Sequence, residues 1–111
     1  MTQDYTFFPD LANQLPELPP ESILSRSLLN ASEVKVTLFR FAPGQELTEH
    51  TAASPAILHF IAGKAALTLG GDEKNAQPGS WVYMPARLPH ALVAKTEVVM
   101  LLLLLTGSSE G

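Results

Sequence analysis

The feature that most constrains the fold is how regularly the chain is interrupted: apolar segments of four to nine residues alternate with Gly, Pro and Asn. There are 7 Gly and 9 Pro among 111 residues, and no segment sustains a helical period. The longest apolar run, Val98 to Leu105, is eight residues long, whereas a membrane-spanning helix needs about 20. Short strands joined by turns are typical of an all-β sandwich or barrel. We therefore predict an all-β fold without a membrane-spanning segment.

The expected strands coincide with the apolar segments and end at turn residues. They are Ile23–Leu29, Val34–Leu38 continuing through Phe41, Glu46–Thr51, Ile57–Ala62, Ala65–Leu69, Trp81–Met84, Ala91–Val93 and Val98–Leu105. Gly70-Gly71-Asp72 is interpreted as a turn. The apolar parity changes after Leu38, which indicates either a β-bulge or a strand buried on both faces.

The length of the chain fits one domain, flanked by two segments of different composition. Residues 1–21 contain four prolines and predict an extended arm, with a short strand over Tyr5–Phe8, rather than a helix. Residues 22–106 form the predicted barrel, and residues 107–111 a flexible tail.

Composition excludes several classes of function. A net charge of -4 leaves no basic patch for nucleic acid or an acidic membrane. The absence of Cys excludes disulfides and thiolate chemistry. Only 16% of the residues are charged, against about 25% in an average domain, so we expect a second copy of the chain to cover part of the surface as a homodimer. The N-terminus has no secretory pattern, which favours the cytoplasm.

Three histidines, His50, His59 and His90, are the candidate metal or acid–base residues. Gly44, five residues, His50, and then Gly63 after the next strand resemble the first motif of the cupin family. Gly79, five residues, Pro85 and then His90 resemble its second motif. The resemblance spans about residues 34–105 and implies a double-sheet jelly-roll barrel.

The chain departs from both motifs. Ala52 stands where the first motif has its second His, and Ala56 where it has its Glu. In the second motif, Arg87 replaces a Gly and Ala94 an Asn. Of the four metal ligands that the resemblance implies, only His50 and His90 remain. The full set suits a divalent Fe, Mn, Ni or Zn ion, whereas two imidazoles alone form a weak site.

Strict alternation along the strands predicts which side chains face the pocket. On this basis Thr48 and His50 face inward together, and His59 faces outward. A bulge after Pro55 would instead bring His59 to the other two histidines as a third ligand. The expected pocket residues are His50, His90, Ala52, Ala56, Leu58, Phe60, Trp81 and Tyr83.

Two functions remain open. One is a barrel that binds a small organic molecule between His50 and His90, with or without a divalent metal. The other is a metal-dependent enzyme of the dioxygenase or isomerase type, with His59 or water completing the ligand set. Arg87 either clamps an anionic ligand at the barrel mouth or is an ordinary exposed arginine. The loss of half the ligand set favours the binding protein.

Overall fold

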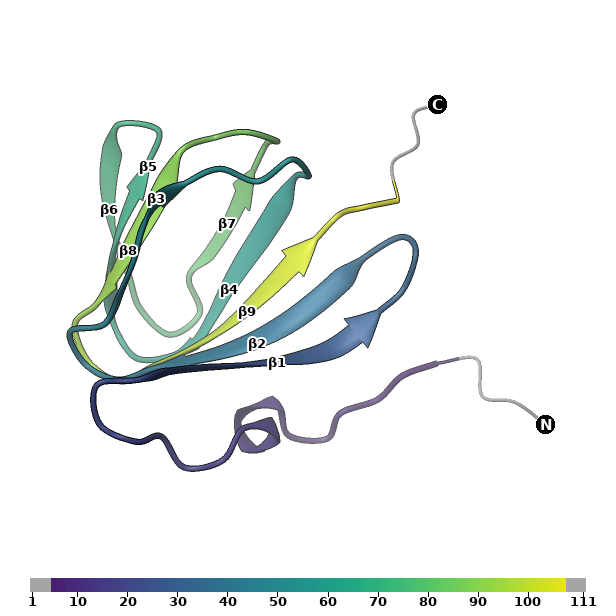
Figure 1. Cartoon of the computed structure of the whole chain (residues 1–111), viewed down its shortest axis with the longest axis horizontal. Helices are drawn as coiled ribbons and strands as arrows, with labels where there is room; N and C mark the ends of the chain where they lie inside the picture. Colours follow the sequence, from purple (N-terminus) through teal and green to yellow (C-terminus); the bar gives the residue numbers. More distant parts are fainter. Residues whose placement is uncertain (1–4, 108–111) are drawn as a thin grey trace.

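The computed structural model describes residues 5–107, which form two antiparallel β-sheets facing each other (Figure 1). The five-stranded sheet has the order β1-β2-β9-β4-β7, and the four-stranded sheet the order β3-β8-β5-β6. The strands of this part of the chain are β1 (Ile23–Asn30), β2 (Lys35–Phe41), β3 (Glu46–His50), β4 (Ala56–Ala62), β5 (Ala65–Leu69), β6 (Asp72–Ala76), β7 (Trp81–Met84), β8 (His90–Ala94) and β9 (Val98–Leu104). The predicted all-β jelly roll is confirmed.

The main core fills the space between the two sheets. It is built from alternate residues of each strand, because successive side chains of a strand point to opposite faces. On β4, for example, Ala56, Leu58 and Phe60 are buried, whereas His59 between them is exposed. Burial of such apolar side chains is the main favourable contribution to the stability of a small barrel.

β2 carries the change of parity noted in the sequence. Its pairing with β9 is regular from Lys35 to Phe41, so β2 itself contains no bulge in this ladder. Phe41 belongs to the core between the sheets, and Leu38 belongs to a second cluster on the outer face. Burial on both faces is therefore the correct alternative. A bulge does occur in the neighbouring strand β1, between Ser27 and Leu29.

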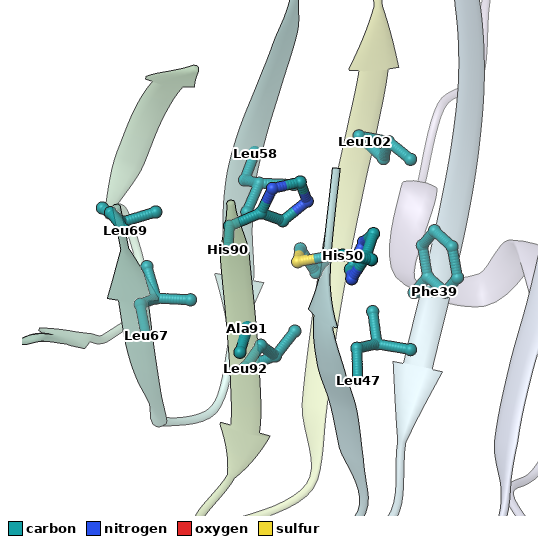
Figure 2. Close-up of a pocket in the computed structure, with 11 residues that line it drawn as sticks. Phe39, Leu47, His50, Leu58, Leu67, Leu69, His90, Ala91, Leu92 and Leu102 are labelled. Atoms are coloured by element: carbon teal, nitrogen blue, oxygen red, sulfur yellow. The ribbon is translucent and has the colours of Figure 1, made fainter. Parts of the chain in front are cut away.

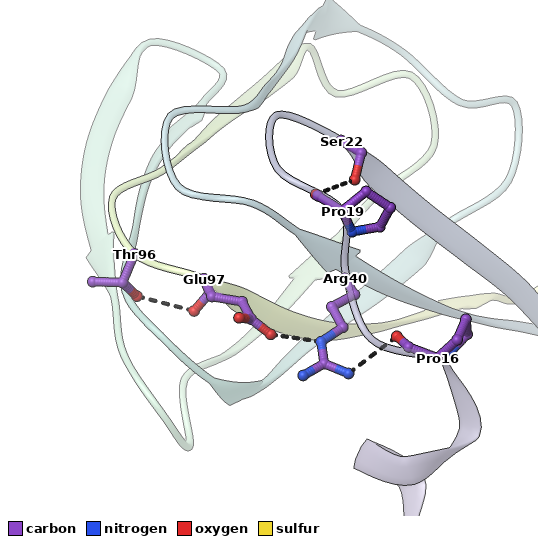
Figure 3. Close-up of polar contacts among 6 residues, drawn as sticks. All are labelled: Pro16, Pro19, Ser22, Arg40, Thr96 and Glu97. Atoms are coloured by element: carbon purple, nitrogen blue, oxygen red, sulfur yellow. Dashed lines mark hydrogen bonds and ion pairs between the residues drawn. The ribbon is translucent and has the colours of Figure 1, made fainter.

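The outer face of β1 and β2 is covered by the N-terminal arm, which crosses it on the side away from the second sheet (Figure 1). Leu15 of the arm is buried against Leu38 and Val99. Arg40 holds the arm in place: its Nε lies 2.6 Å from Glu97 Oε2, and its Nη1 donates to the carbonyl of Pro16 at 3.3 Å (Figure 3). The arm is thus part of the folded domain.

Within the arm, the expectation of an extended chain without helix is wrong over one turn. Leu11–Gln14 form a 3₁₀ helix, whose first turn is held by the Asn13 N–H donating to the carbonyl of Asp10. Such single turns carry little sequence signal because they need only one such bond. The predicted strand over Tyr5–Phe8 is also wrong, since that segment is not paired as a strand within the described chain.

Two further differences concern the edges of the fold. β6 was missed because its first four residues, Asp72 to Asn75, are polar and exposed, as is common for an edge strand. Of the predicted flexible tail only Gly107 is described, and its N–H donates to the carbonyl of Glu33 at 3.0 Å. Residues 108–111 lie outside the described part of the chain. Between residues 5 and 107, no helix has the length and apolarity needed to cross a membrane.

Candidate functional site

The two motif histidines lie side by side on the four-stranded sheet. His50 ends β3 and His90 begins β8, and the two are direct partners in the antiparallel ladder. Their ring centroids are 4.2 Å apart, with the ring planes at 60°. Both imidazoles point toward the space between the sheets, near Leu58 and Phe39 (Figure 2). Residues 40 positions apart in sequence are thus brought together by one strand pairing.

A β-bulge in β3 sets which of its side chains face inward. Leu47 pairs with Leu92 and His50 with His90, so two residues of β3 stand opposite one residue of β8. Leu47 and His50 both line the interior as a result, whereas Thr48 is exposed. The prediction that Thr48 faces inward is therefore wrong, because strict alternation does not hold across a bulge.

Each imidazole is fixed by a backbone carbonyl two residues earlier. His50 Nδ1 lies 2.7 Å from the carbonyl oxygen of Thr48, and His90 Nδ1 lies 2.8 Å from that of Leu88. A carbonyl oxygen can only accept, so in both residues Nδ1 carries the hydrogen and donates it. In the neutral rings, Nε2 then carries a lone pair. The pair is equipped to accept two hydrogen bonds or to coordinate a metal ion.

The histidines border a small apolar cavity between the sheets. Its volume is about 80 Å³. Nine of its eleven lining residues are apolar, and the two histidines supply the polar groups: Phe39, Leu47, His50, Leu58, Leu67, Leu69, His90, Ala91, Leu92, Met100 and Leu102. In Figure 2, Leu67 and Leu69 lie on the His90 side of the pair, and Phe39 lies on the His50 side. A polar group that enters here can therefore be satisfied only near the histidine pair.

Of the residues expected in the pocket, His50, His90 and Leu58 line this cavity. Ala56 and Phe60 are buried elsewhere in the core between the sheets. Ala52 does not line the cavity; its carbonyl accepts a hydrogen bond of 2.7 Å from the backbone N–H of Arg87. That bond connects the segment after His50 to the loop before His90.

The remaining three candidates lie on the outer face of the five-stranded sheet. Trp81 and Tyr83 are exposed on β7, and His59 is exposed on β4, where it pairs with Trp81. The ladder from Ala56 to Phe60 is regular against β9, so no bulge turns His59 inward; the irregularity of β4 falls between Phe60 and Ala62. These three side chains do not belong to the cavity of the histidine pair.

Within the described part of the chain, the two histidines have no third metal-ligating side chain beside them. Among residues 5–107, no group of three or more His, Cys, Asp or Glu side chains is placed to hold one metal ion. Glu46 and Glu49 on β3 are exposed. Two nitrogen donors are fewer than the three protein ligands that catalytic zinc and non-haem iron sites use.

Several residues that line the cavity could not be predicted from the sequence. Phe39 comes from β2, and Met100 and Leu102 come from β9. Their alternation allows either face to be inward, and the choice depends on pairing between strands some sixty residues apart. The inward orientation of Leu47 could not be predicted without knowing that β3 contains a bulge. The histidines alone were marked by their residue type and spacing.

Comparison with known proteins agrees with this geometry. The model of a cupin domain matches residues 37–106. The structure is similar to a conserved protein of unknown function from Streptococcus pyogenes, with 26% sequence identity and a TM-score of 0.82 over 96% of this chain and 93% of that chain. It is also similar to a cupin superfamily protein from Desulfitobacterium hafniense, with 25% identity and a TM-score of 0.80 over 95% and 94% of the two chains.

A cupin from Shewanella frigidimarina shows the same fold, with a TM-score of 0.78 at 15% identity over 96% of this chain and 95% of that chain. No curated protein matches the chain. The matched region contains both histidine motifs. It includes strands β3 to β9 in full and β2 except for its start, whereas β1 lies outside it. On this evidence the chain belongs to the cupin family, with only two histidines in the ligand positions of its barrel.

Proposed function

We propose that this cupin barrel binds a small organic molecule at the His50–His90 pair. The observation that carries the proposal is the arrangement of the two rings: each Nδ1 is committed to a carbonyl, and each Nε2 is left to interact with a ligand beside an apolar cavity. Few polar groups in an otherwise apolar pocket are typical of sites that orient small ligands.

The tautomer defines the chemistry of the ligand. Neutral His50 and His90 accept hydrogen bonds at Nε2, so the ligand presents an O–H or N–H donor to them. The walls of the cavity are apolar, so the part that enters beyond the imidazoles is an aliphatic or aromatic group. Alcohols, phenols and primary amides combine these two features.

The size of the cavity limits how much of the ligand it takes. About 80 Å³ is well below the roughly 300–1,000 Å³ of sites that enclose a drug-sized molecule. We therefore expect a ligand of a few non-hydrogen atoms, or a larger one of which a short apolar end enters. Because His50 is exposed, a larger ligand can extend past it into solvent.

The test is a panel of short alcohols, phenols and primary amides, screened by ligand-observed NMR against the full-length protein. Bound members should shift the Nε2 signals of His50 and His90 in long-range ¹H–¹⁵N spectra. His50→Ala and His90→Ala should each weaken binding about 5–10-fold, through the loss of one hydrogen bond of about 1 kcal/mol. His59→Ala, the same change on the outer face, is the matched control and should leave binding unchanged.

Two results would refute the proposal. One is that no compound of the panel binds the double variant His50→Ala/His90→Ala more weakly than it binds the original protein. The other is binding that leaves both Nε2 signals unmoved while shifting signals elsewhere.

A divalent metal is the second candidate, favoured by one observation. Metal-binding histidines commonly donate their second ring N–H to a carbonyl, as His50 and His90 do here. The donor set nevertheless does not fit the complete metal site of the family, because Ala52 and Ala56 supply no ligand atoms. His50 and His90 would be the only protein ligands, and the affinity would be correspondingly low.

Elemental analysis of tag-free protein separates the two candidates. With organic-ligand binding alone, iron, manganese, nickel and zinc should be far below one atom per chain after dialysis. Near-stoichiometric metal that disappears in His50→Ala/His90→Ala would favour the metal site instead. The variant His59→Ala controls for adventitious binding by a surface histidine.

A further inference from the structure

The two sheets have neighbouring edges at β6 and β7. β6 is an outermost strand of the four-stranded sheet and β7 of the five-stranded sheet, and the two do not pair with each other (Figure 1). The turn over residues 77–80 connects them and is fixed at both sides: the Gly79 N–H donates to the carbonyl of Phe60 at 2.8 Å, and the Ser80 N–H to that of Gln77 at 2.9 Å. The end of β6 and the start of β7 are therefore held close together.

A groove of about 450 Å³, which we call the edge groove, lies between these two strands. Six of the nine described residues that line it are apolar, and Lys74 is the one charged residue among them. Its volume falls within the roughly 300–1,000 Å³ of small-molecule sites, which combine apolar walls with few polar groups. The edge groove is distinct from the cavity of the histidine pair, with which it shares Leu67 and Leu69 and no other described residue.

The strand register places Lys74 on the inner face of its sheet. Lys74 pairs directly with Leu67 of β5, and Ala76, the next residue of β6 on the same face, pairs with Ala65. Directly paired residues of an antiparallel ladder lie on the same face. Leu67, Ala65 and Ala76 all belong to the core between the sheets. The side chain of Lys74 therefore enters the edge groove from the face that carries the core elsewhere in the barrel.

The ammonium group of Lys74 has no anionic partner in the described part of the chain, where the ion pair is that of Arg40 with Glu97. Asp72 and Glu73, the acidic residues next to it in sequence, do not line the edge groove. The carbon chain of a lysine can lie along an apolar wall while its ammonium group stays accessible. Lys74 thus supplies a cation beside an apolar surface.

We propose that the edge groove binds a small monocarboxylate with an aromatic or branched aliphatic body. The carboxylate pairs with the Lys74 ammonium, and the body lies on the inner-face side chains Leu67, Leu69 and Val82. Ser80 Oγ already accepts the N–H of Gln77 at 2.9 Å, so its hydroxyl hydrogen is left to donate to the ligand. One cation matches a single negative charge, which favours a carboxylate over a phosphate dianion.

The chemistry of this ligand differs from that of the ligand proposed for the histidine pair. Near neutral pH a carboxylate is ionised and can only accept hydrogen bonds. It therefore does not suit His50 and His90, whose Nε2 atoms are also acceptors. The proposal involves neither histidine and is independent of the proposed function.

An NMR titration of the full-length protein with phenylacetate near neutral pH tests the proposal. The original protein should bind phenylacetate with a Kd of about 1 mM or tighter. Lys74→Gln should raise the Kd about 10-fold, because it removes a charge-assisted hydrogen bond, and Lys74→Arg should change it less than about 3-fold. Lys35→Gln is the matched control: Lys35 is an exposed strand lysine outside the edge groove, and its replacement should leave the Kd unchanged.

Two further comparisons identify the group that is recognised and the place where it binds. Methyl phenylacetate, the neutral ester without a hydrogen-bond donor, should bind at least about 10-fold more weakly than phenylacetate. The single indole N–H signal, from Trp81, and the methyl signal of Ala76 should both shift during the phenylacetate titration, since both residues line the edge groove. The double variant His50→Ala/His90→Ala should bind phenylacetate as the original protein does.

Three results would overturn the proposal. One is an unchanged Kd for Lys74→Gln whose far-UV circular dichroism spectrum matches that of the original protein. Another is equal affinity for phenylacetate and its methyl ester. The third is that both groove signals stay unmoved at about 20 mM phenylacetate, twentyfold above the expected Kd. Lys74 would then serve only to keep the edge strand β6 from pairing with other chains.

Discussion

Gly63 and Gly44 share a left-handed backbone but differ in their surroundings. Both have φ near +86°, at +87° and +85° respectively. A Cβ on Gly63 would lie 1.9 Å from the carbonyl oxygen of Glu97 and 2.8 Å from Val98 Cα, whereas a Cβ on Gly44 would meet nothing within 4 Å. The β4–β5 turn at Gly63 therefore packs directly on the backbone before β9.

These two glycines form a matched pair of substitutions. Gly44→Ala should lower the free energy of unfolding by about 1–2 kcal/mol, through backbone strain alone. Gly63→Ala should lower it by at least about 3 kcal/mol, because two segments of backbone must also separate. Urea denaturation measures both. Equal effects for the two variants would show that the clash at Gly63 relaxes easily.

Arg87 adopts a left-handed conformation, φ +69°, at the position where the second cupin motif has a glycine. Arg87→Gly should raise the free energy of unfolding by about 1 kcal/mol, because it relieves the steric conflict of Cβ with the backbone. Arg87→Ala keeps the Cβ and should bring no such gain. Thermal denaturation of the two variants distinguishes relief of strain from removal of the guanidinium. An equal gain in both would attribute the effect to the side chain.

At the scale of single residues, the sequence identified the two histidines of the site but few of the apolar residues that line the cavity. His50 and His90 could be found because histidine is rare in the chain and the two motifs fix their spacing. Leu58 followed from alternation on a regular strand. Leu47 and Phe39 could not be placed, since their orientation depends on a bulge and on a strand pairing that leave no local signature.

A strand could be predicted from the sequence where its apolar residues contrast with the polar turns beside it. Ala65–Leu69 and Trp81–Met84 have the predicted bounds, and β9 differs by one residue. β6 has the opposite composition, and an edge strand gains from polar residues that discourage pairing with other chains. The segment is a strand because it pairs with β5, whereas its own residues show no strand pattern.

The arm is the element whose contribution is easiest to measure. Leu15→Ala should lower the free energy of unfolding by about 2 kcal/mol, because it removes buried methyl groups from the cluster with Leu38 and Val99. Leu18 is partly exposed, and Leu18→Ala, the matched control in the same arm, should have a smaller effect. Urea denaturation measures both changes. An equally small effect for Leu15→Ala would mean that the arm contributes little to the stability of the sheet it covers.

The whole molecule is held together by pairings between distant parts of the sequence. β2 and β4 both pair with β9, and β3 pairs with β8. Such non-local topology predicts refolding in about milliseconds to seconds, not in microseconds. Stopped-flow circular dichroism after dilution from urea measures this rate. A microsecond phase that restores the full signal would contradict the dependence on distant pairings.

The place of β9 has a consequence for biosynthesis. It is the last strand of the described chain and the central strand of its sheet, between β2 and β4. Roughly 60 residues separate β2 from β9, so at about 5–20 residues per second the ribosome delivers β9 some 3–12 s later. During that interval β2 and β4 lack the strand that joins them, and the cavity lacks Met100 and Leu102. A nascent chain of this kind thus completes the cavity of the histidine pair only after β9 has been synthesised, and until then the facing edges of β2 and β4 stay unpaired.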